Sequence, residues 1–375
     1  MQTYIVVGAG ILGASTAYHL AKAGAQVTLV DRQDLGQATD AAAGIICPWL
    51  TQRRNKAWYQ LAKNGAKFYP SLIRTLETEG IENTGYARVG AISLHTDPEK
   101  LDKMEERANL RREEAPEIGA IKRLSAKETT QMFPPLDPKF SSLYVSGGAR
   151  VNGRALKNAL VKTAQRYGAS LVKGSASLIY NNDQVSGVEV EGRRLEADQV
   201  IVTTGAWVKE LLQPLDVHFL ITPQKAQIIH LEIPQADTSH WPVVMPPNNQ
   251  YILTFDHGRV VIGATHEDEM GFDTKATAGG MYEVLHKALE VAPGLKDSTF
   301  LETRVGFRPV APDFLPVIGS LPKVKGLMLA NGLGASGLTV GPYLGFELAK
   351  LALNQAVDIE LTNYAVDTAI KTEEN

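Results

Sequence analysis

The stretch "TYIVVGAGILGASTAYHLAKAGAQVTLVD", residues 3–31, decides the fold predicted for this chain. It opens with a short run rich in β-branched residues and continues with three glycines in the spacing G-x-G-x-x-G. The first glycine permits a tight turn, the second lets the backbone approach a pyrophosphate, and the third lets a helix pack against the strand. The pattern predicts a strand over 3–7 and a helix whose N-terminus faces phosphates. The cofactor-binding residues predicted in this turn are Gly8, Ala9, Gly10, Ile11, Leu12 and Gly13.

A second strand completes the unit. The helical pattern stops at Gly24, the run 26–30 reads as a strand, and Asp31 stands at its end, eighteen residues after the last glycine of the motif. A carboxylate there accepts a hydrogen bond from a ribose hydroxyl and disfavours a 2′-phosphate. We predict that Asp31 and the neighbouring Arg32 contact a dinucleotide. The motif alone does not separate NAD from FAD, and the alternative is a βαβ turn without a ligand.

Composition limits the class of protein. The chain has 375 residues, 44% hydrophobic and 21% charged, with a formal charge of -3, which predicts two domains or one interleaved fold and no nucleic-acid partner. The single cysteine, Cys47, excludes an internal disulfide and a cysteine metal cluster, and it favours a reducing, cytoplasmic location. We expect no metal site, no signal peptide and no transmembrane segment. The uncharged run 326–346 contains six glycines and a proline, so a loop against a ligand explains it better than a membrane span.

Later segments resemble the glycine oxidase / D-amino-acid oxidase family of FAD enzymes, in order along essentially the whole chain. ATDAAAGIICPW (38–49) is similar to the small-residue turn along the flavin. GGARVNGRAL (147–156) and VIVTTGAW (200–207) resemble the middle crossover and the strand and turn over the adenosine side. GLMLANGLGASGLTVGPYLGFELAKLAL (326–353) resembles the closing strand, glycine loop and helix. The resemblance implies FAD, bound without a covalent link.

Glycines in the last segment bring backbone close to a flat ligand, and a helix opening near Leu338 points its positive dipole end toward it. For each segment alone the alternative is a packed α/β turn. The further positions that the resemblance implies as FAD contacts are Ala42, Ala43, Gly44, Ile45, Gly205, Trp207, Arg308, Gly334, Ala335, Ser336, Gly337, Leu338 and Thr339.

An arginine interrupts the apolar stretch GFRPVAPDFLPVIG (306–319). A buried guanidinium needs a counter-charge because it cannot be deprotonated inside a protein. Arg308 matches the arginine that binds the substrate carboxylate in the resembling family, which implies that the substrate supplies the counter-charge. The alternative is a structural ion pair, for instance with Asp313.

Tyr251, in NNQYILTFDHGRVVIGAT, matches the family's substrate-contacting tyrosine, with plain packing on a strand as the alternative. His266 and Trp49 could line the same cavity, although structural roles suit them better. The sequence departs from glycine oxidase at Ala335, where that enzyme places a second arginine, and at Leu333, where relatives often carry histidine. The resemblance therefore leaves the substrate open.

The family's layout implies an α/β fold: a Rossmann-like FAD-binding domain, 1–86, 140–221 and 303–375, with an inserted α+β substrate domain built on an antiparallel sheet, 87–139 and 222–302. Its chemistry implies oxidation of a D-amino acid, glycine or N-methyl amino acid by hydride transfer from Cα to flavin N5, giving an imine that hydrolyses to a keto acid.

Other readings stay open. An NAD-linked dehydrogenase or disulfide reductase explains the first motif, but the sequence has no second G-x-G-x-x-G and no C-x-x-C pair. A non-catalytic or RNA-modification-related flavoprotein is a different class. The electron acceptor is O₂ or a quinone or other carrier, and whether the chain forms a homo-oligomer is open.

Overall fold

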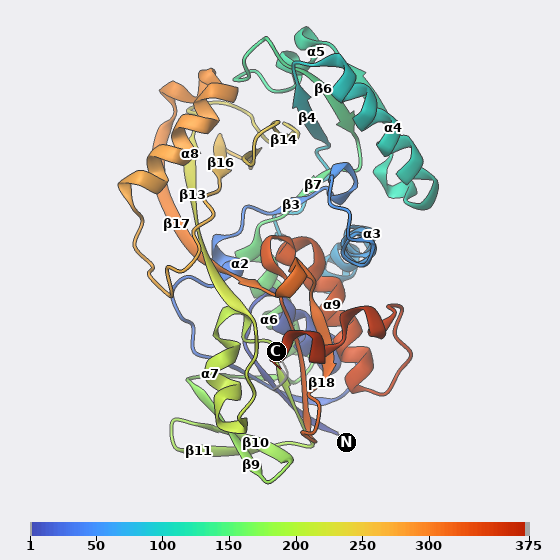
Figure 1. Ribbon diagram of the computed structural model, residues 1–375, viewed down its shortest axis with the longest axis vertical. Coiled ribbons are helices and arrows are strands. Elements are labelled where there is room, and N and C mark those ends of the chain that lie inside the picture. Colours follow the sequence, from blue (N-terminus) through green and yellow to red (C-terminus); the bar gives the residue numbers. More distant parts are fainter. Residues whose placement is uncertain (1, 372–375) are drawn as a thin grey trace.

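The computed structural model describes residues 2–371 and shows two bodies joined by long strands (Figure 1). The lower body in Figure 1 carries α6, α7 and α9, and the upper body carries α4, α5 and α8. Strands β13 (Thr222–Glu232) and β17 (Thr299–Val310) run between them.

The lower body is built on a six-stranded sheet in the order β18-β19-β12-β1-β2-β8. All neighbours are parallel except β18 and β19, which are antiparallel. The predicted strand over 3–7 is confirmed as β1, and the second predicted strand as β2. The strands are β18 (Val317–Ser320), β19 (Leu327–Asn331), β12 (Gln199–Val202), β1 (Thr3–Val7), β2 (Gln26–Asp31) and β8 (Ser170–Lys173).

Helices pack closely against this sheet and against one another. Helix α1 begins at Ile11, directly after the second glycine of the motif. It packs on α6 and α9, and α3 packs on α9. Gly345 makes the α1–α9 contact possible, since a Cβ there would lie 2.7 Å from the carbonyl oxygen of Leu12. The helices are α1 (Ile11–Lys22), α3 (Lys56–Thr78), α6 (Gly153–Arg166), α7 (Val208–Leu212) and α9 (Gly337–Ala352).

Two small sheets complete the lower body. The three-stranded sheet β11-β10-β9 packs on β12 and shares a hydrophobic core with the six-stranded sheet. A two-stranded ladder joins the segment after α2 to the segment before α6. The elements are β9 (Ala176–Asn181), β10 (Gln184–Val190), β11 (Arg193–Glu196), β3 (Ile45–Ile46), β7 (Ala149–Arg150) and α2 (Ala38–Ala41).

The upper body is an eight-stranded sheet in the order β17-β13-β16-β15-β14-β4-β6-β5. The predicted α/β fold with a second, antiparallel-sheet domain is confirmed, with one difference: β14 and β4 pair in parallel. These two strands come from the two separate inserted segments, so no hairpin sets their relative direction. The elements not yet bounded are β16 (Arg259–Gly263), β15 (Tyr251–Thr254), β14 (Val243–Met245), β4 (Ala91–His95), β6 (Ser141–Val145), β5 (Ile121–Leu124), α4 (Pro98–Glu114), α5 (Ala126–Met132) and α8 (Ala278–Val291).

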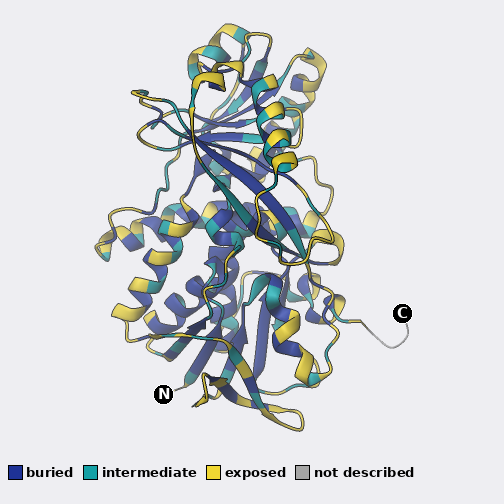
Figure 2. Ribbon diagram, turned by 90° about the vertical axis from the view of Figure 1, so that its left-hand side faces the viewer, coloured by how far each residue is buried: buried dark blue, intermediate teal, exposed yellow. Residues whose placement is uncertain are grey.

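Burial follows this layering. Figure 2 shows most buried residues in the central strands of both bodies, while exposed residues lie on outward helix faces, on turns and on the hairpin strands at the bottom of the view. The domain limits stay a prediction: the limit at 140 lies just before β6, and the limit at 303 falls within β17. In the span that the structure describes, no helix has both the length and the apolar character needed to cross a bilayer.

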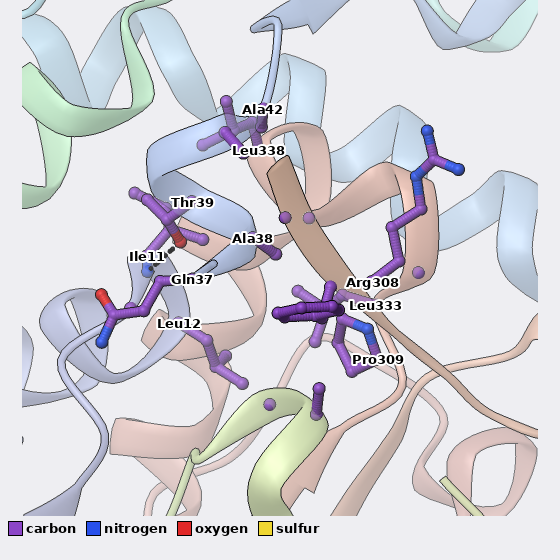
Figure 3. Close-up of a pocket in the computed structure, with 18 of the residues that line it drawn as sticks. Ile11, Leu12, Gln37, Ala38, Thr39, Ala42, Arg308, Pro309, Leu333 and Leu338 are labelled. Atoms are coloured by element: carbon purple, nitrogen blue, oxygen red, sulfur yellow. Dashed lines mark hydrogen bonds between the residues drawn. The ribbon is translucent and has the colours of Figure 1, made fainter. Parts of the chain in front are cut away.

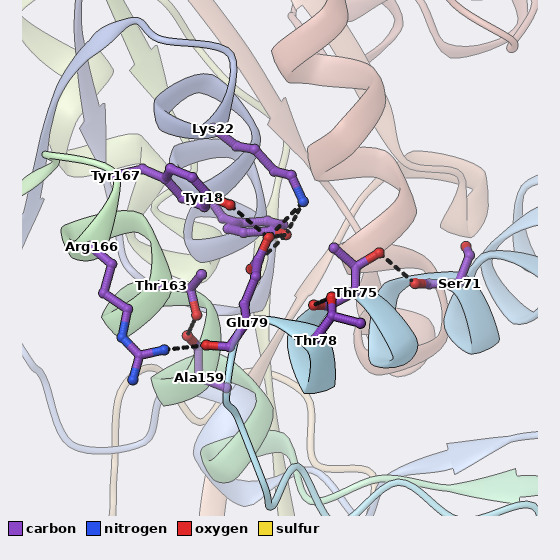
Figure 4. Close-up of polar contacts among 10 residues, drawn as sticks. All are labelled: Tyr18, Lys22, Ser71, Thr75, Thr78, Glu79, Ala159, Thr163, Arg166 and Tyr167. Atoms are coloured by element: carbon purple, nitrogen blue, oxygen red, sulfur yellow. Dashed lines mark hydrogen bonds and ion pairs between the residues drawn. The ribbon is translucent and has the colours of Figure 1, made fainter.

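Glu79 ties three helix ends together in the lower body (Figure 4). Its carboxylate accepts hydrogen bonds from Lys22 (2.7 Å) and Tyr18 of α1 and from Tyr167, which follows α6. Its carbonyl oxygen accepts from Arg166. Although burial alone raises the pKa of Glu79, these partners lower it overall. These contacts link the C-terminal ends of α1, α3 and α6.

Candidate functional site

One groove passes along the ends of the lower sheet and reaches the face of β13 and β17 (Figure 3). In Figure 3, Ile11, Gln37 and Thr39 lie on one side of it and Arg308 on the other. Its lining comes from segments far apart in sequence, namely residues within 8–12, 31, 37–45, 203–207, 226–228, 251, 306–309 and 330–339.

The first glycine turn forms one end of the groove. Gly8 has φ +100°, and a Cβ there would lie 2.6 Å from the carbonyl oxygen of Thr203. Gly10 is the N-cap of α1, which has neither a side-chain cap nor an acidic residue in its first turn. The Ile11 N–H donates to the hydroxyl of Thr39 at 3.0 Å. The other N–H groups of this helix end face a position suited to an anion.

Asp31 lies beside this turn at the end of β2, as predicted. One carboxylate oxygen accepts from the N–H of Ala9 at 2.5 Å. The other accepts from the N–H of Gln33 at 2.6 Å and from the amide of Gln37 at 2.9 Å. These bonds fix the carboxylate at the edge of the groove, where it also contributes to the lining.

The small-residue turn after α2 forms a flat wall. Gly44 has φ +99°, and a Cβ there would overlap the carbonyl oxygen of Val151, so chain packing alone requires glycine. Ala42, Ala43 and Ile45 line the groove beside it. No long side chain from this turn fills the space.

A second helix N-terminus closes the far side. Asn331, at the end of β19, donates from its side chain to the carbonyl oxygen of Gly205 at 3.0 Å, which joins the two turns. Gly332 and Gly334 have φ +80° and +50°. Helix α9 then begins at Gly337 with no side-chain cap and no acidic residue in its first turn. Its positive dipole end therefore faces the groove.

Arg308 lies where β17 crosses the groove. Its Nη1 donates to the side-chain oxygen of Gln224 (3.0 Å) and to the carbonyl oxygen of Thr265 (3.3 Å). Burial lowers the pKa of Arg308, and the neighbouring Tyr251 acts in the opposite direction. Its side chain forms no ion pair with a carboxylate of residues 2–371, so the alternative that it pairs with Asp313 is wrong.

Tyr251 lines the same end of the groove at the start of β15. Burial raises the pKa of its phenol to about 12, although the charge of Arg308 favours the ionised form. The phenol is therefore neutral at ordinary pH. Among the described lining residues, the ionisable side chains are Asp31, Tyr251 and Arg308.

Three residues predicted to contact the cofactor, Ala9, Gly13 and Ser336, do not line the groove but stabilise the backbone around it. The N–H of Ala9 fixes Asp31, and a Cβ at Gly13 would overlap the carbonyl oxygen of Gly8, so this glycine serves helix packing. The hydroxyl of Ser336 donates back to the loop carbonyl of Leu333 at 2.8 Å.

Three other side chains lie outside the groove lining. Arg32 forms ion pairs with Asp34 (2.6 Å) and Glu210 (2.8 Å). Trp49 is buried in the core, and His266 is exposed. Neither Trp49 nor His266 contributes to the cavity.

Sequence reasoning missed several lining residues. Gln37 and Thr39 flank the start of the quoted small-residue turn, and their polar side chains were a usable signal. Ala226 and Ile228 lie on β13 and reach the groove only because β13 pairs with β17. No local sequence pattern predicts that these two residues line the groove.

The groove fits an extended dinucleotide such as FAD. It combines a glycine turn with close backbone, two uncapped helix N-termini, a carboxylate beside the first of them, and a flat apolar wall. Cys47 is not among its lining residues, and burial raises the pKa of that thiol to about 12. In residues 2–371 no group of three or more metal-ligating side chains is found.

Comparison with known proteins agrees with this geometry. The model of the family described as DAO, FAD dependent oxidoreductase, matches residues 3–351. The chain is 61% identical to the oxidoreductase YurR of Bacillus subtilis (97% of this chain, 98% of that protein) and 30% identical to the glycine oxidase of Pseudomonas aeruginosa (97% and 98%). The crystal structure of iminodiacetate oxidase from Chelativorans sp. BNC1 superposes with a TM-score of 0.94 at 45% identity, covering 96% of this chain and 98% of that one.

Proposed function

The chain belongs to the DAO family of FAD-dependent oxidoreductases, which act on amines or amino acids, and we propose that its substrate is a small amino acid or secondary amine with one carboxylate. Non-covalent binding of FAD is typical of the family. The observation that carries the proposal is Arg308, a largely desolvated cation with only neutral partners in the described chain.

Arg308 supports a single-carboxylate substrate because it is the sole cation of the described lining. A guanidinium binds a carboxylate through two parallel N–H groups, which fixes both the position and the angle of the bound molecule. The surrounding side chains are Ala226, Ile228 and Tyr251, which favour a small neutral substituent over a second charge. This lining differs from what a dicarboxylate substrate needs.

Bound FAD supplies an acceptor for the hydride that leaves the substrate carbon next to the amine nitrogen. Arg308 holds the carboxylate, and this orientation is the chain's main contribution to the reaction. The neutral phenol of Tyr251 donates a hydrogen bond to the bound molecule. The loss of hydride from the free amine leaves an iminium cation, and its hydrolysis gives a keto acid, the released amine and a proton.

Among the described lining residues, no side chain is placed to remove the amine proton. Asp31 is held by Ala9, Gln33 and Gln37 at the other end of the groove. The phenol of Tyr251, whose pKa burial raises to about 12, already carries its proton and therefore cannot accept one from the amine. The substrate therefore reacts as the free amine. We expect kcat/KM to rise with pH along the pKa of each substrate's own amine, and a profile that is identical for substrates of different amine pKa contradicts this step.

The test is anaerobic bleaching of the oxidised flavin absorption by glycine, sarcosine, D-alanine, D-proline and iminodiacetate. Wild-type protein is expected to bleach with monocarboxylates, more slowly with iminodiacetate, and hardly at all with amino-acid methyl esters. Arg308→Ala should lower kcat/KM by about 100-fold or more, because it removes two charge-assisted hydrogen bonds. Arg194→Ala, at an exposed arginine of β11, is the matched control.

Two outcomes overturn the proposal. If no amine or amino acid of the panel bleaches the flavin, the substrate class is wrong and a non-catalytic flavoprotein becomes the better reading. If methyl esters react as well as the acids, Arg308 is not the anchor. Reoxidation in air, compared with reoxidation by a soluble quinone, then distinguishes an oxidase from a dehydrogenase.

A further inference from the structure

We propose that Gln224 is a positioning residue that holds Arg308 in the groove while leaving its charge for the carboxylate of the substrate. The inference rests on the proposed function, because it assigns a task toward the same carboxylate. It adds a residue of β13 that contributes nothing to the groove lining itself.

The sheet places the two side chains together. Gln224 in β13 and Arg308 in β17 are direct register partners. The described hydrogen bonds of the Arg308 side chain are both on Nη1, to Gln224 and to the carbonyl oxygen of Thr265. Those two acceptors match the two N–H groups of Nη1. The edge formed by Nε and Nη2 is left for a bidentate carboxylate.

Asp268 fixes which end of the Gln224 amide faces Arg308. The side-chain nitrogen of Gln224 donates to a carboxylate oxygen of Asp268 at 2.9 Å. Since an amide has one donor end and one acceptor end, this contact turns the oxygen toward Arg308. Gln224 therefore stands between an exposed acid and the guanidinium, and it prevents that acid from pairing with Arg308 directly.

A neutral residue at position 224 matters because it leaves the positive charge of Arg308 available to the substrate carboxylate. A glutamate at position 224 would neutralise Arg308 from within the chain and compete with the substrate. An apolar residue of the same length would leave Nη1 with one acceptor and a looser orientation. A purely structural role, in contrast, links the two strands and has no preference between ligands.

The experiment measures the dissociation constant of methoxyacetate, in which an ether oxygen replaces the amine of sarcosine so that oxidation to an imine is blocked. Binding to the FAD-loaded protein is followed by the change in flavin absorption and by calorimetry. We compare wild type, Gln224→Glu, Gln224→Met and Arg308→Ala, with Gln213→Glu at an exposed, distant position as the charge-matched control. Thermal midpoints check that each variant is folded.

We expect Gln224→Glu to weaken methoxyacetate binding by about 10- to 100-fold, the effect of one charge-assisted hydrogen bond, and Gln224→Met by about 3- to 10-fold. For a substrate that the enzyme oxidises, KM should rise in parallel with the dissociation constant of methoxyacetate, while kcat changes less than about 3-fold. Gln213→Glu should bind like wild type.

The outcomes separate this inference from the proposed function. If Arg308→Ala abolishes methoxyacetate binding while both folded Gln224 variants bind like wild type, the anchor stands and the role of Gln224 is refuted. Equal losses in the Glu and Met variants also refute it, since charge then plays no part. If wild type fails to bind methoxyacetate, the carboxylate anchor fails and this inference falls with it.

Discussion

Gly10 and Gly13 belong to one motif, yet the structure predicts opposite consequences for a methyl group at each. At Gly10 the φ angle is -63°, which any residue adopts, and the nearest atom to a Cβ is the Thr39 hydroxyl at 3.4 Å. At Gly13 a Cβ would overlap the carbonyl oxygen of Gly8 and the hydroxyl of Thr203. Gly10 therefore has room in the folded chain, and Gly13 has none.

The magnitudes follow from these contacts. Gly10→Ala should leave apoprotein stability unchanged or raise it by about 0.4–1 kcal/mol, because alanine reduces the freedom of the unfolded chain. The same methyl group projects where a pyrophosphate would meet the backbone. With overpacking at about 1–3 kcal/mol, FAD binding should weaken by about 5- to 150-fold. Gly13→Ala should destabilise the apoprotein itself by about 3 kcal/mol, because α1 must move away from β1.

The assay is a pair of measurements on apoprotein: urea unfolding followed by circular dichroism, and titration with FAD followed by quenching of flavin fluorescence. Gly24→Ala tests the role of backbone conformation alone, since φ there is +86° and no atom lies within 4 Å of a Cβ. If Gly10→Ala binds FAD with wild-type affinity, or if Gly13→Ala unfolds like wild type, the assignment of ligand approach to one glycine and helix packing to the other is refuted.

Three further predictions concern stability and the groove. Burial holds the pKa of His19 and His230 at about 3, against 6.5 in the unfolded chain. The stability that depends on these neutral histidines is therefore complete above pH 6.5 and is lost as the pH falls toward 3. Urea unfolding measured from pH 7 to 4 should show that unfolding takes up as many as about two protons, and an uptake near zero contradicts the assignment. The fully buried side chain of Lys225 pairs at 3.0 Å with Asp273, whose side chain is 35% exposed. Asp273→Ala leaves the buried lysine without a counter-charge and should cost about 2–3 kcal/mol, while Lys225→Met should be nearly neutral in the same unfolding experiment; the reverse order contradicts this assignment. Phe272 stacks at 5.0 Å on the tryptophan that ends η3 (Gly205–Trp207), so Phe272→Ala should raise the FAD dissociation constant by about 2- to 10-fold; unchanged affinity in the titration means that this ring does not support the groove.

Local patterns were enough for the glycine turn and its flanking elements. The strand over 3–7, the helix behind it and Asp31 at the end of the next strand depend on contacts between residues close in sequence, so spacing and residue type specify them. The alternative partner proposed for Arg308, in contrast, was wrong, because the described partners of its side chain are Gln224 and Thr265, which are distant in the sequence.

The sequence by itself determined the dinucleotide turn and the presence of one unusual arginine, because the turn follows from local glycine spacing and periodicity and the arginine interrupts an apolar stretch. The α/β class with an inserted sheet came from the resemblance of the sequence to a known family. Only the tertiary structure decided what surrounds that arginine. Gln224 meets Arg308 because β13 and β17 are in register, and Thr265 reaches it from beyond β16. Gln224 and Arg308 are 84 residues apart in the sequence, so short-range patterns do not predict that they are partners, and the packing of the whole sheet sets their pairing.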